Sequence, residues 1–183
     1  MTIIVSGLER SGTSLMMQIL EDAGYDLCYD EQRKPDEHNP NGYYELSDGK
    51  IILELMDNEF DIGNYKDKVI KITAYGLHML ESNNYKVIYM KRDLDEVISS
   101  QRKMIYTYHR FTPTIDDKKL LKKIDNQALN FLKDNKIDYM VVDYNKLMDN
   151  PRRELNTVSK FLGKNIIKSM RVIDKNLYRN RRS

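Results

Sequence analysis

Residues 2–20, TIIVSGLERSGTSLMMQIL, constrain the fold of this chain more than any other stretch. An apolar β-branched run, Ile3 to Val5, leads into the turn GLERSGTS at 7–14, and an amphipathic pattern follows it. This order predicts a buried strand, a glycine-bearing turn and the start of a helix. Backbone N–H groups and the helix dipole of such a unit can together hold a phosphate group.

The spacing of this turn is that of the nucleotide-triphosphate loop, G-x-x-x-x-G-K-[ST], with one departure. Thr13 stands in the position of the lysine, and Arg10 is the only cation in the turn. Without that lysine the loop is poorly built for Mg-assisted transfer of a γ-phosphate. It can still hold a phosphate-like group that is already activated, and we expect it to bind a group of that kind.

A second segment with the same logic lies at 86–100, KVIYMKRDLDEVISS. A short β-rich run predicts a strand, and Asp93 followed by Glu96 three residues later predicts a capped helix start. Arg92 then lies at the strand end, and Ser100 lies in the second turn of the helix. Arginine offers a forked, permanently charged donor for a phosphate, and serine offers a neutral hydroxyl.

These two segments and a third, YMVVDYNKLMDNPRRELNTVSKFLG at 139–163, each match a known family. Arg-Ser-Gly-Thr-Ser after an apolar strand resembles the 5′-phosphosulfate loop of sulfotransferases that use PAPS (3′-phosphoadenosine 5′-phosphosulfate). It is closest to the tyrosylprotein-type and bacterial branches, which carry Arg where cytosolic sulfotransferases carry Lys. The pair Arg92 and Ser100 is similar to the family's 3′-phosphate motif, and the segment 139–163 resembles its later strand, Pro-opened helix and FLG.

The resemblance implies one sulfotransferase-like domain over residues 1–183 and an α/β fold, a three-layer P-loop-type parallel sheet flanked by helices. The residue pattern agrees, because alternating strands and helices favour a parallel sheet that is covered on both faces. We expect strands near 2–6, 69–73, 86–91 and 139–143, with a weaker one at 25–29. We expect helices near 13–23, 45–57, 75–82, 94–108, 117–135 and 151–162, with a further one at 164–171.

The resemblance also implies which residues bind the nucleotide. The candidates from the two phosphate motifs are Arg10, Ser11, Gly12, Thr13, Ser14, Arg92 and Ser100. Arg10 is in addition a catalytic candidate, since it could stabilise charge on the leaving phosphate oxygen. Late basic segments close on the 3′-phosphate in several branches, which adds Arg179, although the chain lacks the cytosolic family's late G-x-x-G-x-x-K motif.

The acceptor's proton needs a base, and here the sequence leaves alternatives open. In the segment Lys71-Ile72-Thr73, a threonine stands where cytosolic members carry a histidine. Glu31, in Glu31-Gln32-Arg33, resembles the Glu-x-Arg of tyrosylprotein sulfotransferases and is the first candidate. Glu45 is the second, because bacterial sulfotransferase-like proteins carry a similar Asn-Pro-x-Gly-Tyr-Tyr-Glu. Asp30 and His38 remain further alternatives.

Composition narrows the class of protein. The 183 residues carry a formal net charge of only +2, too little for bulk nucleic-acid binding. No apolar run approaches membrane-spanning length, and scattered histidines with one cysteine give no metal-site spacing. Together with the sulfotransferase resemblance, which implies an enzyme, these features lead us to expect a cytoplasmic, metal-independent protein. Its acceptor is expected to be a small molecule, a peptide or a sugar, and the oligomeric state is left open. The alternatives are an ATP- and Mg-using P-loop phosphotransferase and a non-catalytic nucleotide-binding module.

Overall fold

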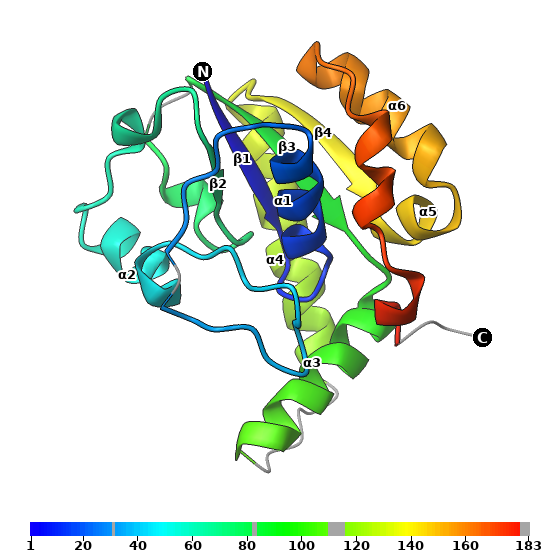
Figure 1. Cartoon of the computed structure of the whole chain (residues 1–183). Coiled ribbons are helices and arrows are strands. Elements are labelled where there is room, and N and C mark those ends of the chain that lie inside the picture. The colour runs from blue at the N-terminus through cyan, green and yellow to red at the C-terminus, as the bar shows by residue number, and fades with distance from the viewer. Residues whose placement is uncertain (31, 82–83, 110–115, 180–183) are drawn as a thin grey trace.

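A computed structural model describes residues 1–30, 32–81, 84–109 and 116–179 (Figure 1). Its centre is a four-stranded parallel sheet with the order β2-β1-β3-β4. The strands are β1 (Thr2–Gly7), β2 (Val69–Lys71), β3 (Tyr85–Lys91) and β4 (Asp138–Asp143). The four main strands are confirmed, but the weaker strand expected at 25–29 is wrong. Only one bridge, between Leu27 and Val69, forms there before the polar 30–44 stretch leaves the sheet.

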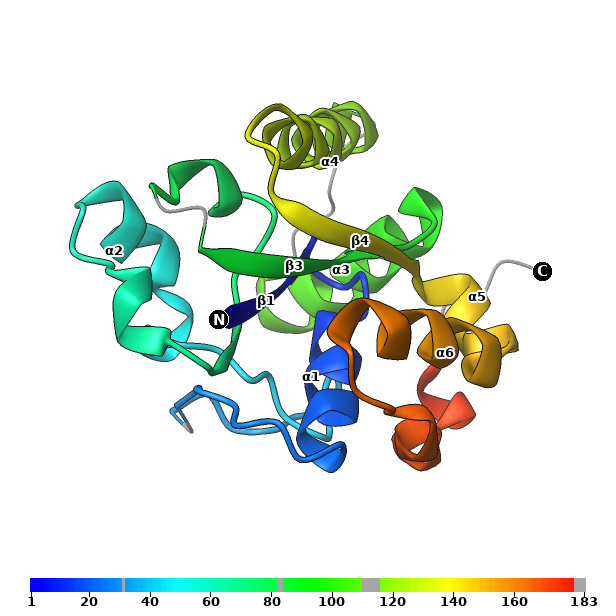
Figure 2. The same ribbon diagram turned by 90° about the horizontal axis from the view of Figure 1, so that it is seen from above.

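Helices cover both faces of the sheet, so the three-layer α/β architecture is confirmed (Figure 2). The helices are α1 (Thr13–Asp22), α2 (Ile51–Met56), α3 (Leu94–His109), α4 (Asp116–Asp134), α5 (Tyr144–Asp149) and α6 (Pro151–Leu162). One buried cluster joins α2, α3 and α4 to the sheet, and a second joins α1, α5 and α6 to the opposite face. Neighbouring residues of one strand point to opposite faces, so Ile4 enters the first cluster and Val5 the second.

Three of the expected helices are shorter or tighter than the sequence pattern indicated. The helix expected at 45–57 is a 3₁₀ turn, η1 (Ser47–Gly49), followed by α2, and the one at 75–82 is only the 3₁₀ turn η3 (Leu77–Met79). The one at 164–171 is the 3₁₀ helix η4 (Ile167–Val172). Two further 3₁₀ turns are η2 (Ile62–Tyr65) and η5 (Lys175–Leu177), and α5 was not expected.

Local chemistry explains the helix boundaries that the sequence did predict. The side chain of Asp93 accepts from the backbone N–H of Glu96 at 3.2 Å and so caps α3. Asn150 caps α6 in the same way, Pro151 occupies its first turn, and Gly163 ends it at φ 70° in the left-handed region.

All four strands are parallel, so their carboxyl ends lie at one edge of the sheet. The chain leaves this edge at Gly7, Lys71, Lys91 and Asp143. Ligands of open α/β sheets bind outside this edge. Among the described residues, no helix has both the length and the apolar character needed to cross a lipid bilayer.

Candidate active site

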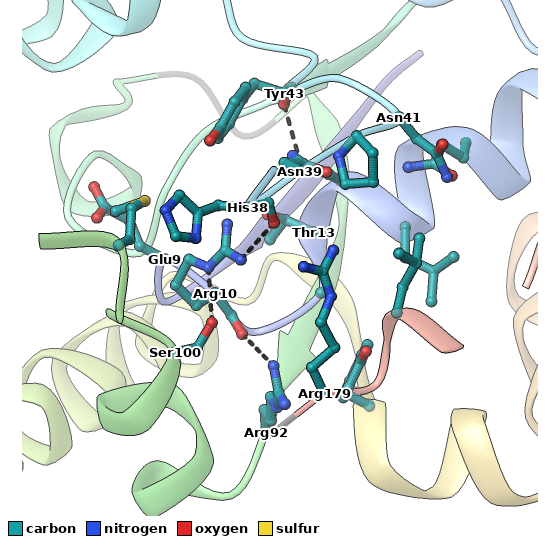
Figure 3. A pocket seen from close by; sticks show the side chains of 18 of the residues that line it. Glu9, Arg10, Thr13, His38, Asn39, Asn41, Tyr43, Arg92, Ser100 and Arg179 are labelled. Carbon is teal, nitrogen blue, oxygen red and sulfur yellow. Dashed lines mark hydrogen bonds between the residues drawn. The ribbon is translucent and has the colours of Figure 1, made fainter. Parts of the chain in front are cut away.

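A cavity opens at the carboxyl edge of the sheet (Figure 3). Its walls come from the loop at 9–15, the 33–45 stretch and the ends of β2 and β3. They also include the middle of α3, α5 and the C-terminal segment 172–179. Segments that are far apart in the sequence therefore surround one space. Arg10, Arg92 and Arg179 all lie around it, one from each of three of these segments (Figure 3).

Two glycines allow the loop after β1 to fold as tightly as it does. Gly12 has φ +97°, and a Cβ atom added there would lie 2.3 Å from Cδ2 of Tyr144. Gly7 has φ +144°, and its Cβ would lie 2.3 Å from the carbonyl oxygen of Met90. Side chains are excluded at both positions by backbone conformation and by space. Arg10 adopts φ 70° between them, which is uncommon for a residue other than glycine.

The first turn of α1 borders the cavity. Gly12 is its N-cap and has no side chain, so no side-chain cap covers the helix start. The backbone N–H groups of a first helical turn have no acceptor within the helix. Residues 12–15 all line the cavity, and no acidic residue lies in the first turn of α1. These donors and the positive end of the helix dipole favour an anion at this position.

Arg10 connects the loop to two other walls of the cavity. Its Nε donates to Oγ of Ser100 at 2.9 Å, and Nη2 donates to the carbonyl oxygen of His38 at 2.8 Å (Figure 3). Burial lowers the pKa of Arg10 and nearby Arg92 lowers it further, while Tyr43 and Asp36 act in the opposite direction. A guanidinium titrates so far above neutrality that Arg10 keeps its positive charge.

Arg92 contacts the same loop from the end of β3. Its Nη1 donates to the carbonyl oxygen of Arg10 at 3.1 Å, and its Nε pairs with the Glu96 carboxylate at 2.9 Å. Arg92 and Ser100 thus both contact Arg10, one at its carbonyl and one at its side chain. The structure brings together the two motifs that the sequence had proposed separately.

The remaining loop residues lie in different positions. Thr13 and Ser14 line the cavity, and Oγ of Ser14 donates to the carbonyl oxygen of Tyr43 at 3.2 Å. Ser11 does not belong to the described lining: its N–H donates to the carbonyl oxygen of Leu8 at 3.1 Å. Its hydroxyl is buried near Gly7 without a partner in the described part of the chain.

A cation pair surrounds the Glu45 carboxylate on the other side of the cavity. Nη1 of Arg33 lies 3.0 Å from Oε2, and Nζ of Lys71 lies 3.4 Å from Oε1. The Glu45 side chain is 19% exposed and lines the cavity. The carboxylate can therefore meet a ligand in the cavity while two cations fix its direction.

Lys71 is a cavity residue that we did not select from the sequence. Its side chain is 5% exposed and donates to the carbonyl oxygen of Tyr43 and to Glu45. Burial lowers its pKa to about 8, although the Glu45 carboxylate acts to raise it. The signal was present, because Lys71 interrupts the apolar run VIKI at a strand end, where a charge needs a partner or a task.

The remaining candidates from the sequence differ in whether their side chains line the cavity. Glu31 lies outside the described residues. His38 lines the cavity and holds Arg10 through its backbone carbonyl, and Thr73 lines the cavity as well. The N–H of Asp30 donates to the carbonyl oxygen of Glu45 at 2.9 Å. Arg179 lines the cavity and donates from Nη1 to the carbonyl oxygen of Glu37 at 2.8 Å.

These groups form a cavity lined by several cations, with the Glu45 carboxylate among them. The cations belong to the loop between β1 and α1, the end of β2, the end of β3 and the C-terminal segment. In the described part of the chain, no group of three or more His, Cys, Asp or Glu side chains is placed to hold a metal ion. The arrangement suits transfer of an anionic group to an acceptor that must lose a proton.

Comparisons with known proteins agree with this description. The sequence profile of the "Sulfotransferase domain" family matches residues 1–181. The sulfotransferase domain of the Synechococcus PCC 7002 olefin synthase superposes with a TM-score of 0.53 at 18% identity, covering 100% of this chain and 77% of that one. A sulfotransferase from Mycobacterium avium superposes with a TM-score of 0.55 at 11% identity. The match covers 93% of this chain and 66% of that one.

The sulfotransferase domain from the curacin biosynthetic pathway gives a TM-score of 0.50 at 15% identity, covering 99% of this chain and 77% of that one. At these identities the structural likeness shows a shared fold. No curated protein matches this chain.

Proposed function

This chain belongs to the sulfotransferase domain family, and on that premise we propose that it moves the sulfuryl group of PAPS to an acceptor hydroxyl or amine. The observation that carries the proposal is the direct contact of Arg10 with both Arg92 and Ser100. A 5′-phosphosulfate loop and a 3′-phosphate motif must face one nucleotide, and here they share one cavity.

The residues present fit a nucleotide with two anionic ends. The open first turn of α1, with Arg10, Thr13 and Ser14, would hold the phosphosulfate. Arg92 and Ser100 would hold the 3′-phosphate, and Arg179 would add a further charge from the C-terminal segment. The apolar side chains of Met148, Val172 and Leu177 also line the cavity and offer a surface for the adenine base.

PAPS would supply an activated sulfuryl group, so the protein itself needs no covalent intermediate. Its residues would place the acceptor oxygen or nitrogen in line with the bond that breaks. Arg10 and Lys71 would stabilise negative charge on the leaving phosphate oxygen, because both are cations that line the cavity. A buried cation is effective here, since little water screens it.

Glu45 is our candidate for the residue that takes the acceptor's proton. Its carboxylate lines the cavity between Arg33 and Lys71, and these two cations give it a fixed direction. Geometry is the first requirement of a general base. Glu31 remains a prediction from the sequence alone.

The test is transfer of radioactive sulfur from [³⁵S]PAPS to a panel of sugars, small alcohols, amines and peptides. We expect a labelled product with at least one acceptor class and a rate about 10²–10⁴-fold lower for Glu45→Gln, with nucleotide affinity nearly unchanged. The matched control is Glu54→Gln, which changes a half-buried carboxylate on α2 outside the cavity lining. Nucleotide binding with no labelled product from any class would favour a non-catalytic module.

A further inference from the structure

Glu96 is a buried carboxylate that joins three parts of the chain. It lies in the first turn of α3 and is 3% exposed. Its Oε2 accepts from Nε of Arg92 at 2.9 Å, and its Oε1 accepts from Nδ2 of Asn145 at 3.0 Å and from the Tyr178 hydroxyl at 3.1 Å. Asn145 belongs to α5, and Tyr178 belongs to the C-terminal segment.

The guanidinium of Arg92 is fixed on its other sides as well. Its Cζ lies 4.6 Å from the ring centroid of Tyr144 and 5.5 Å from that of Tyr178, and the two rings meet edge to face. Nη1 donates to the carbonyl oxygen of Arg10. Only 7% of the Arg92 side chain is exposed, and that side chain lines the cavity.

These contacts hold the Arg92 side chain in one conformation before a ligand binds. A free arginine samples many rotamers, and binding a phosphate would then include the entropic cost of ordering it. An arginine whose Nε is already paired keeps its outer N–H groups in a set direction. Glu96 costs little in repulsion of a phosphate, because Arg92 neutralises it and two further donors bind its second oxygen.

We propose that Glu96 is a positioning residue for recognition of the 3′-phosphate, holding Arg92 and the C-terminal Tyr178 with one carboxylate. The inference rests on the proposed function. Tyr178 precedes Arg179, whose Nη1 bonds to the carbonyl oxygen of Glu37, so the same carboxylate also anchors the segment that brings Arg179 to the cavity. Burial raises the pKa of Tyr178 to about 12, with further contributions from the charge of Glu96 and the hydrogen bond to it, so the Tyr178 hydroxyl remains a donor at neutral pH.

The test compares two nucleotides that differ only in the 3′-phosphate. Calorimetric titration of the full chain with 3′,5′-adenosine bisphosphate and with 5′-AMP gives the ratio of their dissociation constants. We expect Glu96→Gln to reduce the preference for the bisphosphate by about tenfold or more, the scale of one charge-assisted hydrogen bond. Asp95→Asn changes the neighbouring carboxylate, which pairs with Lys118, and should leave the ratio unchanged.

Tyr178→Phe removes the hydroxyl but keeps the ring against Arg92. We expect it to lower the same ratio, by less than Glu96→Gln does. In the double variant, Tyr178→Phe should cause no further fall in the ratio beyond that of Glu96→Gln, because both changes break the same hydrogen-bond network. Tyr178→Phe also keeps the inference testable if Glu96→Gln does not fold.

The ratio of the two dissociation constants distinguishes a loss of positioning from a general loss of structure, because a loss of structure would weaken the binding of both nucleotides alike. An unchanged or increased ratio in Glu96→Gln, beside a wild-type protein that prefers the bisphosphate, would overturn this inference and leave the proposed function standing. A wild-type protein that shows no preference for the bisphosphate would contradict the proposed function itself, and the inference with it.

Discussion

The side chain of Arg10 donates to the hydroxyl of Ser100 at 2.9 Å, across 90 positions of the sequence. The contact links the loop after β1 to α3 at the edge of the cavity. A change at either residue is therefore expected to affect both phosphate motifs, and the two motifs have to be tested with ligands that separate them.

Arg92→Ala is expected to weaken the binding of 3′,5′-adenosine bisphosphate far more than the binding of 5′-AMP. Each charge-assisted hydrogen bond that is lost should cost about 1.5–3 kcal/mol, and only the bisphosphate makes the bonds at the 3′ position. Titration calorimetry with both nucleotides measures the difference. Arg102→Ala, an exposed change on α3 and outside the described lining, is the control. Equal losses for both nucleotides would remove Arg92 from this role.

Arg10→Ala is expected to damage turnover more than nucleotide binding. Its interaction should strengthen as charge develops on the leaving oxygen, so its loss belongs to the transition state. We expect kcat to fall by about 10²–10³-fold, as for removal of one such donor, with a smaller change in KM. Arg10→Lys keeps the charge and should recover part of the rate. A raised KM with unchanged kcat would make Arg10 a binding residue only.

Gly12→Ala is expected to destabilise the fold. The new Cβ would meet the ring of Tyr144 at 2.3 Å, and φ +97° strains any other residue. Overpacking costs about 1–3 kcal/mol, and the left-handed backbone adds about 1–2 kcal/mol. Gly163→Ala is the matched control, since φ is +70° but nothing lies within 4 Å of its Cβ. Urea denaturation should show a clearly larger loss at Gly12, and equal losses would contradict the close contact.

Lys71 predicts a pH dependence of stability. Burial lowers its pKa to about 8 from 10.5, so between these values the unfolded chain binds the proton more tightly than the folded one. The free energy of unfolding should then rise with pH across this window, relative to Lys71→Met. Below about pH 8 the difference between the two proteins should be constant. Denaturation curves at several pH values measure this, and parallel pH profiles for both proteins would contradict it.

The sequence predicted best what local residues determine. The β1 strand, the glycine turn and α1 are consecutive in the chain, so the local pattern of residues 2–20 was enough to predict them. The helix cap at Asp93 was equally visible. The helix expected at 75–82 is only the 3₁₀ turn η3, beside Gly76, where an added Cβ would lie 2.7–2.9 Å from Ile72, Ile52 and Leu55. These contacts come from segments that the local pattern does not show.

The candidate site could be predicted only in part. The sequence named Arg10, Arg92 and Ser100, but their mutual contacts depend on tertiary packing. Lys71 and Glu96 were missed as site residues because each looks local: one lies at a strand end and the other looks like part of a helix cap. Their partners, Glu45 and Tyr178, are distant in the sequence, so only the fold shows what these charges do.

The most direct test of the central claim is the nucleotide preference of the wild-type chain. Calorimetric titration should show that 3′,5′-adenosine bisphosphate binds at least about tenfold more tightly than ATP with Mg²⁺, because Arg92 and Ser100 offer a second phosphate site and Thr13 replaces the lysine that a triphosphate loop uses. Adding EDTA should leave the bisphosphate affinity unchanged. Tighter binding of ATP with Mg²⁺, or a bisphosphate affinity that is lost with EDTA, would contradict the account.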